Sequence, residues 1–244
     1  MRALLRTDGV GKAYGGVQAL DDCSLAVQEG SVTGLIGPNG SGKTTLFNVI
    51  TGYAKADAGE VYLSDTKITN MSPHKVFNAG IGRTFQLTRI FPSLTVLENM
   101  LVPSSSASQG KAGGRRQAME QLEFVGIANH AKELAGTLSY GQRKLLELAY
   151  VLVADPAVIL LDEPAGGVNP TLVGQIAARI KELNATGKTF LIVEHNMEFV
   201  MGLCDVVAVL DAGTVVANGP PDMIRTDPRV LDAYLGTDLA EDEL

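Results

Sequence analysis

The 244-residue sequence has no tryptophan and only two cysteines, Cys23 and Cys204, which lie far apart in the chain. Neither cysteine belongs to a C-x-x-C pair or has the spacing of zinc ligands, which excludes a redox dithiol and a cysteine-based zinc site. Two isolated thiols are typical of a protein in a reducing compartment, where cysteines simply pack. The three histidines, His74, His130 and His195, are scattered, so the sequence shows no metal-binding cluster.

Positive charge and long apolar runs are scarce as well. The formal net charge of −7 argues against a nucleic-acid partner, because nonspecific nucleic-acid binding usually needs a basic surface. No apolar run approaches the length of a membrane-spanning helix, about 18 residues, and runs such as Ala157–Leu161 and Val206–Leu210 have the length of strands. The N-terminus lacks the apolar core and cleavage site of a signal peptide. These absences predict a protein of the cytoplasm.

A glycine-rich segment, GPNGSGKT at 37–44, follows the apolar run 31–36 and precedes a predicted helix over 43–51. It matches the pattern G-x-x-x-x-G-K-[ST], in which backbone amides and the helix start bind phosphate, Lys43 reaches the outer phosphates and the Thr44 hydroxyl ligates Mg²⁺. A chance glycine turn is the alternative. We predict a site for a nucleoside triphosphate and Mg²⁺. The residues assigned to the nucleotide here are Gly37, Pro38, Asn39, Gly40, Ser41, Gly42, Lys43, Thr44 and Thr45.

Two acids follow a predicted buried strand at 158–161. Asp162 would hold Mg²⁺ through water, and Glu163 would orient or deprotonate the water that attacks the γ-phosphate. In open α/β sheets such acids lie in the ligand crevice beyond the strand ends. The alternative is a pair of acids that caps the next helix.

The order of β-like and helical runs predicts an α/β fold: a P-loop NTPase core with a mostly parallel sheet, an antiparallel β flank and an inserted helical subdomain. We expect a single domain over 1–244, in which 1–86 and 157–244 form the core and 87–156 the helical subdomain. Within that subdomain, the low-complexity stretch 103–114 is expected to be a surface loop.

The stretch 138–142, LSYGQ, has the features of a helix start and contains no strong acid, strong base or metal ligand. Ser139 and Gln142 have the spacing of a capping box, and Leu145 and Leu148 begin an apolar helical stripe. The residues alone leave open whether this helix start only caps a core helix or also binds an anion.

The P-loop, LSYGQ and the acidic pair, in this order and spacing, resemble an ATP-binding-cassette (ABC) ATPase over nearly the whole chain. LSYGQ resembles the signature LSGGQ. The resemblance implies that the signature contacts ATP held by the P-loop of a second ATPase subunit. The residues it assigns to that contact are Ser139, Tyr140, Gly141 and Gln142.

Three further roles are implied by the resemblance. Gln86 would touch Mg²⁺ and sense the transmembrane partner, His195 would hydrogen-bond the γ-phosphate, and Tyr14 would stack on adenine. Taken alone, Gln86 would be an ordinary loop residue, His195 a strand cap, and Tyr14 a packing residue. The implied catalytic set is Lys43, Gln86, Glu163 and His195, and the implied metal set is Thr44, Gln86 and Asp162.

Finer matches resemble the ATPase subunits of branched-chain amino acid importers: 81–86 with Ile90-Phe91-Pro92, then 95–99, 194–197 and the tail 227–236. The resemblance implies a second ATPase subunit, two membrane permeases, an extracytoplasmic solute-binding protein and a peripheral place at the cytoplasmic face of the membrane. The sequence departs from the family pattern at Tyr140, where glycine is usual, and at Gly166 and Asn169, where serine and aspartate are usual.

Two other functions compete with transport. A soluble ABC ATPase of DNA repair or translation usually has tandem cassettes, a coiled coil or basic extensions, and none is visible here. A P-loop kinase of small molecules has no reason to contain LSYGQ.

Overall fold

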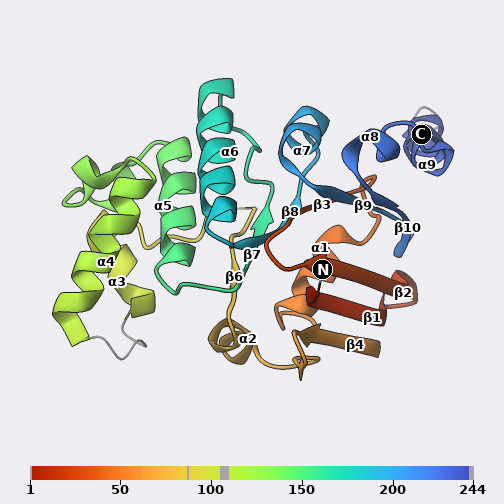
Figure 1. Ribbon diagram of the computed structural model, residues 1–244, viewed down its shortest axis with the longest axis horizontal. Helices are drawn as coiled ribbons and strands as arrows, with labels where there is room; N and C mark the ends of the chain where they lie inside the picture. The colour runs from red at the N-terminus through yellow and green to blue at the C-terminus, as the bar shows by residue number, and fades with distance from the viewer. Residues whose placement is uncertain (1, 87, 105–109, 242–244) are drawn as a thin grey trace.

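Six strands form the central sheet of the computed structural model, which describes residues 2–86, 88–104 and 110–241 (Figure 1). Five of the strands are parallel, and β10 at one edge is antiparallel to β9. In spatial order the strands are β10 (Thr214–Gly219), β9 (Val206–Asp211), β3 (Val32–Ile36), β8 (Thr189–Val193), β7 (Val158–Asp162) and β6 (Ile81–Arg83). Strands β3, β8 and β7 are buried at every residue, as expected when helices or a second sheet cover both faces.

A second sheet of four antiparallel strands packs beside the first (Figure 1). Its strands are β2 (Val17–Gln28), β1 (Ala3–Tyr14), β4 (Ala58–Leu63) and β5 (Thr66–Lys67). The long hairpin of β1 and β2 turns at Gly15 and Gly16, whose positive φ angles of 54° and 95° favour glycine.

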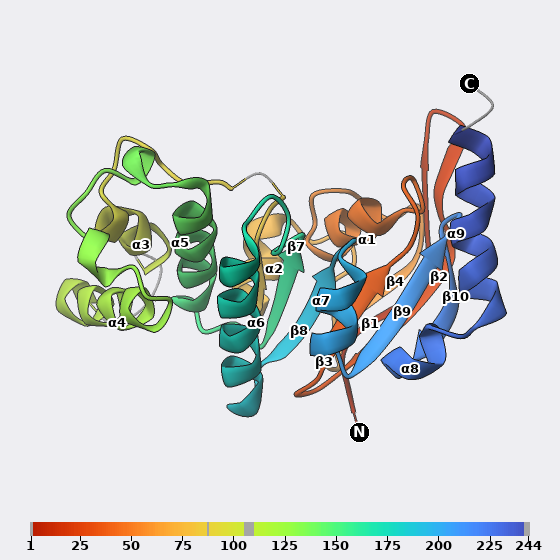
Figure 2. The same ribbon diagram turned by 90° about the horizontal axis from the view of Figure 1, so that it is seen from above.

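The two faces of the central sheet belong to different cores because side chains alternate along each strand. Leu35, Leu160 and Leu191 face the core shared with the antiparallel sheet. Helices α1 (Lys43–Ile50) and α2 (Pro73–Ala79) complete that core. Ile36 and Ile192 face the opposite core. That side carries α6 (Pro170–Ala185), α7 (Met197–Leu203), α8 (Pro221–Ile224) and α9 (Pro228–Glu241) (Figure 2).

A helical segment projects at one end of the molecule (Figures 1 and 2). It contains α3 (Val96–Ser104), α4 (Gly110–Phe124) and α5 (Tyr140–Leu152), with short 3-10 turns at Ala128–His130 and Ala135–Thr137. The three helices contact one another, and their buried apolar side chains continue the core on the α6 side of the sheet.

The expected fold class is confirmed: a mostly parallel sheet, an antiparallel flank and a helical segment. The prediction of a surface loop at 103–114 is wrong for the described residues, because residues 103–104 end α3 and residues 110–114 begin α4. Residues 105–109 lie outside the described part. The boundaries 1–86, 87–156 and 157–244 remain a prediction.

Both cysteines are buried, and burial raises the pKa of each thiol to about 12, so they pack as small apolar groups. In the described part of the chain, no helix is long and apolar enough to cross a membrane.

Phe190→Ala in β8 should lower the free energy of unfolding by about 3–5 kcal/mol, because Phe190 is fully buried and its loss leaves a cavity. Phe91→Ala is the matched control, since Phe91 is 48% exposed. Urea unfolding followed by circular dichroism measures both. Equal losses in the two variants would contradict the placement of Phe190 in the core.

Candidate functional site

Three segments reach one edge of the central sheet because the parallel strands β3, β7 and β8 end there. The glycine-rich loop at 37–42 follows β3, Glu163 follows β7, and His195 comes two residues after β8. The fold thus brings together positions that are more than 120 residues apart in the sequence.

Glycine is required at two points of the loop. A Cβ on Gly37 would lie 2.0 Å from the carbonyl oxygen of Leu210, and one on Gly42 would lie 2.4 Å from that of Ala19. Gly42 also has a φ of 106°, which side chains disfavour, and directly precedes α1. The loop can therefore press against the neighbouring strands and still direct backbone amides outward at a helix start.

The ammonium group of Lys43 is held by the loop itself. It donates to the carbonyl oxygens of Gly37 at 2.9 Å and Pro38 at 2.7 Å, and to Ser41 Oγ at 3.3 Å. Burial lowers the pKa of Lys43, while the charge of Glu163 acts in the opposite direction. These neutral partners are weaker than a phosphate, so the cation can be transferred to an anionic ligand.

Glu163 stands between two polar side chains. Gln86 Nε2 donates to Glu163 Oε2 at 3.0 Å, and His195 Nε2 lies 3.2 Å from Glu163 Oε1. The backbone of Glu163 has φ 49°, an uncommon value for a residue with a side chain and one often found at functional sites. An amide, a carboxylate and an imidazole in this arrangement can orient a water molecule and accept its proton.

A cavity of about 290 Å³ joins this trio to the loop. The predicted site residues that line it are Asn39, Gly40, Gly42, Lys43, Thr44, Thr45, Gln86, Glu163 and His195. Tyr14 is not among its lining residues. It is 48% exposed at the end of β1, and the nearest charged group recorded for its ring is Lys12, 5.1 Å from the centroid.

Asp162, the residue before Glu163, is not among the lining residues of this cavity and forms an ion pair that the sequence did not predict. Its Oδ2 accepts from Arg83 Nη2 at 3.0 Å, and both side chains are almost fully buried, at 6% and 7% exposure. Arg83 also donates from Nη1 to Asn48 at 2.7 Å and to Thr51 at 2.9 Å, so it ties Asp162 to α1.

The donor set here suits Mg²⁺. A hydroxyl at Thr44, an amide at Gln86 and a carboxylate at Asp162 are the oxygen ligands that this ion prefers. Among the described residues, no three His, Cys, Asp or Glu side chains could hold a metal by themselves. Mg²⁺ needs no such group, because it usually combines one or two carboxylates with phosphate oxygens and water.

Sequence reasoning also missed two buried carboxylates near the site. Glu194 accepts from the backbone amides of Ala165 at 2.6 Å, His195 at 3.0 Å and Asn196 at 3.2 Å, and so links the segments after β7 and β8. Glu147 of α5 is 4% exposed, and burial raises its pKa to about 7. The sequence carried no signal for Glu147, because it lies two residues after Leu145 and so on the side of α5 opposite the apolar stripe.

The signature segment opens a separate, wider cavity of about 730 Å³ that is lined in part by Ser139, Tyr140, Gly141 and Gln142. The predicted capping box is present: Ser139 Oγ accepts from the Gln142 amide at 3.3 Å, and Gln142 Oε1 accepts from the Ser139 amide at 2.8 Å. A single subunit therefore separates these four residues from the cavity beside Glu163.

The departures from the family pattern have local explanations. The Tyr140 ring fills the space beside Gly167, where a Cβ would lie 3.2 Å from Tyr140 Cε1. A Cβ on Gly166 would lie 3.3 Å from the carbonyl oxygen of Glu163, which leaves little room for a serine. Asn169 caps α6 by accepting from the Leu172 amide at 2.9 Å.

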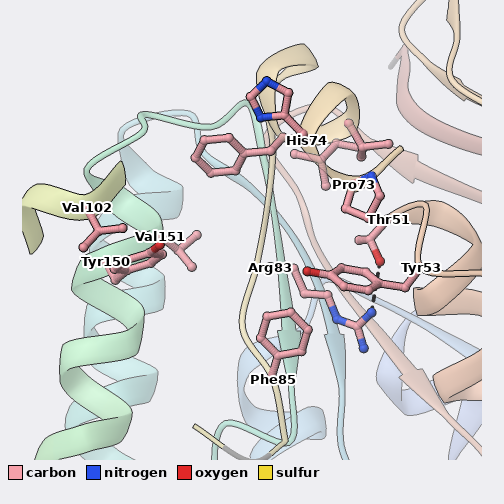
Figure 3. Close-up of a pocket in the computed structure, with 12 residues that line it drawn as sticks. Thr51, Tyr53, Pro73, His74, Arg83, Phe85, Val102, Tyr150 and Val151 are labelled. Carbon is pink, nitrogen blue, oxygen red and sulfur yellow. Dashed lines mark hydrogen bonds between the residues drawn. The ribbon is translucent and has the colours of Figure 1, made fainter. Parts of the chain in front are cut away.

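A third cavity, of about 340 Å³, lies between α2, the C-terminal part of α5 and the strand that leads to Gln86 (Figure 3). Tyr53, Phe85 and Tyr150 supply aromatic walls, and Arg83 points between Tyr53 and Phe85 (Figure 3). The Tyr53 and Phe85 rings meet edge to face at 5.6 Å. The guanidinium that binds Asp162 thus also forms part of an open apolar pocket.

Comparisons with known proteins agree with this geometry. The family model described as ABC transporter matches residues 20–166, and the one described as branched-chain amino acid ATP-binding cassette transporter matches residues 214–240. The high-affinity branched-chain amino acid transport ATP-binding protein LivG of Escherichia coli K12 is 38% identical over 251 residues, which cover 96% of this chain and 98% of LivG.

Solved structures show the same fold. An ATP-binding cassette of an ABC transporter in its ADP conformation is 38% identical, with a TM-score of 0.87 over 97% of this chain and 100% of that one. A dimeric cassette in a post-hydrolysis state, bound to ADP and Pi, is 28% identical, with a TM-score of 0.81 over 89% and 98% of the two chains. The chain belongs to the ABC transporter family, as one of its ATP-binding cassette proteins.

Proposed function

We propose that this chain is the ATP-hydrolysing subunit of an importer for branched-chain or related amino acids. The observation that carries the hydrolytic part is the placement of Glu163 between Gln86 and His195, at the cavity that the P-loop lines. The transport part is supported by the relatives, which are branched-chain amino acid transport proteins, and by the matching C-terminal family model at 214–240. Neither supports the competing roles in DNA repair, translation or small-molecule phosphorylation.

Hydrolysis proceeds by in-line attack of water on the γ-phosphate of ATP. The P-loop amides of 37–45 and the ammonium group of Lys43 bind the phosphates, so Lys43 leaves its carbonyl partners for phosphate oxygens. Glu163 accepts the proton of the attacking water, and Gln86 and His195 hold its two carboxylate oxygens. His195, whose side chain is 46% exposed, donates to the γ-phosphate. Tyr14 stacks on adenine.

Thr44, Gln86 and Asp162 would hold Mg²⁺, with Asp162 acting through water. When bound, the ion neutralises negative charge that develops on the phosphate oxygens. Arg83 holds Oδ2 of Asp162 in place, so that the carboxylate has a fixed position beside Glu163.

A second ATPase subunit completes the site. The signature residues Ser139–Gln142 line a cavity of their own, and one subunit carries a single set of hydrolytic residues. The dimeric relative supports a pair of cassettes. In this pair each signature meets the ATP held by the other subunit's P-loop. The partner is a related second chain or a second copy of this chain, and ATP binding closes the pair.

Two membrane permeases contact the face around Gln86–Asn99. This face carries the exposed Phe91 and adjoins the aromatic pocket of Figure 3. Apolar side chains left exposed beside a pocket are typical of docking sites. The chain is thereby held at the cytoplasmic face of the membrane as a peripheral subunit, and the permeases and a solute-binding protein select the amino acid.

Glu163→Gln should retain ATP binding and lose at least 100-fold in kcat, because the amide fills the same space but cannot accept the proton. Glu182→Gln is the control, since Glu182 is an exposed carboxylate on α6 that pairs with Arg179. Steady-state hydrolysis and equilibrium binding of ATP measure the two effects. Turnover near that of the parent would show that Glu163 is not the residue that accepts the proton of the attacking water.

Ser139→Trp should leave ATP binding to the monomer unchanged and abolish ATP-driven dimerisation, because the indole would occupy the place of the partner's phosphate. Ser139→Ala is the matched comparison: it removes the hydroxyl and the helix cap, which costs about 1 kcal/mol of stability, and should weaken dimerisation less than Ser139→Trp because it adds no bulk. Analytical ultracentrifugation with ATP, in the Glu163→Gln background, reports association. If Ser139→Trp weakened nucleotide binding to the monomer, the signature would serve its own subunit.

Phe91→Asp should release the chain from membranes that contain its permeases, because a charge replaces the exposed apolar side chain of the docking face. Val17→Asp, at the 69% exposed Val17 on the β1–β2 hairpin, should leave membrane association unchanged. Sedimentation of co-expressed membranes measures both. Retention of the Phe91 variant at the parent level would argue against docking here.

A further inference from the structure

Helix α5 carries two charged side chains into the core. Lys144 and Glu147, three residues apart, are 7% and 4% exposed. Burying charge is costly unless each charge finds partners, so an apolar residue would be the simpler choice if these positions only filled space. The partners of both side chains lie in the hydrolytic site of the same subunit.

Glu147 binds the chain on both sides of Gln86. Its Oε1 accepts from the backbone amide of Phe85 at 3.0 Å and from that of Arg89 at 3.4 Å. Because one oxygen receives both amides, the two ends of the short segment that bears Gln86 are fixed to a single point on α5. A shift of α5 at Glu147 therefore moves Gln86.

Lys144 binds the backbone of the other hydrolytic residue. Its Nζ donates to the carbonyl oxygen of Glu163 at 2.6 Å. Glu163 is the residue with a φ of 49°, which the surroundings must hold in place. Helix α5 thus contacts Glu163 itself and the residues on either side of Gln86, whose side chain donates to Glu163 at 3.0 Å.

The other end of α5 is the signature. Ser139 caps the helix, and Glu147 follows two turns later, about 12 Å along the axis at the usual rise of an α-helix. The Lys144 ammonium lies 5.7 Å from the centroid of the Tyr140 ring, so the first turn also contacts this charged pair. A regular helix transmits a displacement of its first turn to the third.

We propose that Glu147 is a positioning residue for Gln86, and that α5 transmits the engagement of its signature end to the hydrolytic residues of its own subunit. The transmission rests on the proposed function, in which the signature meets the partner's ATP. Each ATP site then responds to the other. When the nucleotide of one subunit binds the signature of the second subunit, α5 of the second subunit changes the position of Gln86 in that same subunit. The acceptor oxygen of Glu147 carries this role, not its charge.

Glu147→Leu should lower kcat at least tenfold and leave the KM for ATP within twofold, because it removes the acceptor and touches no nucleotide-binding residue. Glu147→Gln should stay within about twofold of the parent, since its Oε1 can accept the same two amides. Leu146→Ala is the control for lost stability: Leu146 is fully buried on the same helix. It should lower the melting temperature without the change in kcat.

Amide hydrogen exchange of Phe85 and Arg89, measured by NMR on the full chain, reports positioning without turnover. Exchange should accelerate at both amides in Glu147→Leu and stay at the parent rate in Glu147→Gln and Leu146→Ala. Unchanged exchange and kcat in Glu147→Leu would overturn the proposal. So would a Glu147→Gln variant as impaired as Glu147→Leu, because charge and not the acceptor would then matter.

Transmission is tested in the Glu163→Gln background, in which ATP is retained. ATP-driven dimerisation should slow the exchange of the Phe85 and Arg89 amides, and Glu147→Leu should abolish that slowing while the dimer still forms. A dimer that leaves these amides unchanged in the parent background would overturn transmission alone. If ATP drives no association, the proposed dimer and the transmission both fail, while the kinetics of the monomer still decide the role of Glu147.

Discussion

The parallel arrangement of β3, β7 and β8 is the constraint on which the site depends. Strands that run in the same direction must end at the same edge, so the segments that follow them meet there. The P-loop, Glu163 and His195 each follow one of these strands and need no long loop to reach the others. The fully buried strands in turn make this edge rigid, because both faces of the sheet belong to packed cores.

Buried charges hold the segments in register once the strands have brought them together. Each has its own kind of partner: Asp162 has a guanidinium, Lys43 has loop carbonyls, and Glu147 and Glu194 have backbone amides. In a low-dielectric interior a missing partner would be expensive, so these contacts favour one arrangement of the loops over others. Gln86, Glu163 and His195 lie at the surface of this network, where Glu163 remains accessible to solvent.

Much of the fold and of the candidate site could be predicted from the sequence, because local patterns encode local structure. The strand–glycine loop–helix of 31–51 and the apolar run before Asp162 identified the two halves of the site. The capping box at Ser139 was equally readable, since it depends on two residues three apart. The ion pair of Arg83 with Asp162 could not be predicted, because it joins residues 79 positions apart. Only the register of the folded sheet brings them together.

At the low-complexity stretch 103–114, local composition predicts the wrong structure. Glycines and serines at 103–114 favour a loop, yet the described parts of that stretch continue α3 and begin α4. Packing of the helical segment overrides a weak local preference. Glu147 escaped prediction because it lies outside the apolar stripe of its helix, so that only the fold reveals its burial and the amides of Phe85 and Arg89 that it binds.

The capping box at Ser139 also determines which ligands its hydroxyl can serve. One of the two lone pairs of Ser139 Oγ receives the Gln142 amide, which leaves the hydroxyl hydrogen and one lone pair for a ligand. Phosphate oxygens, which only accept hydrogen bonds, match that hydrogen, while a group that only donates has a single lone pair left to bind. The hydrogen bond that begins the helix therefore halves the accepting capacity of the hydroxyl and leaves its donating capacity intact.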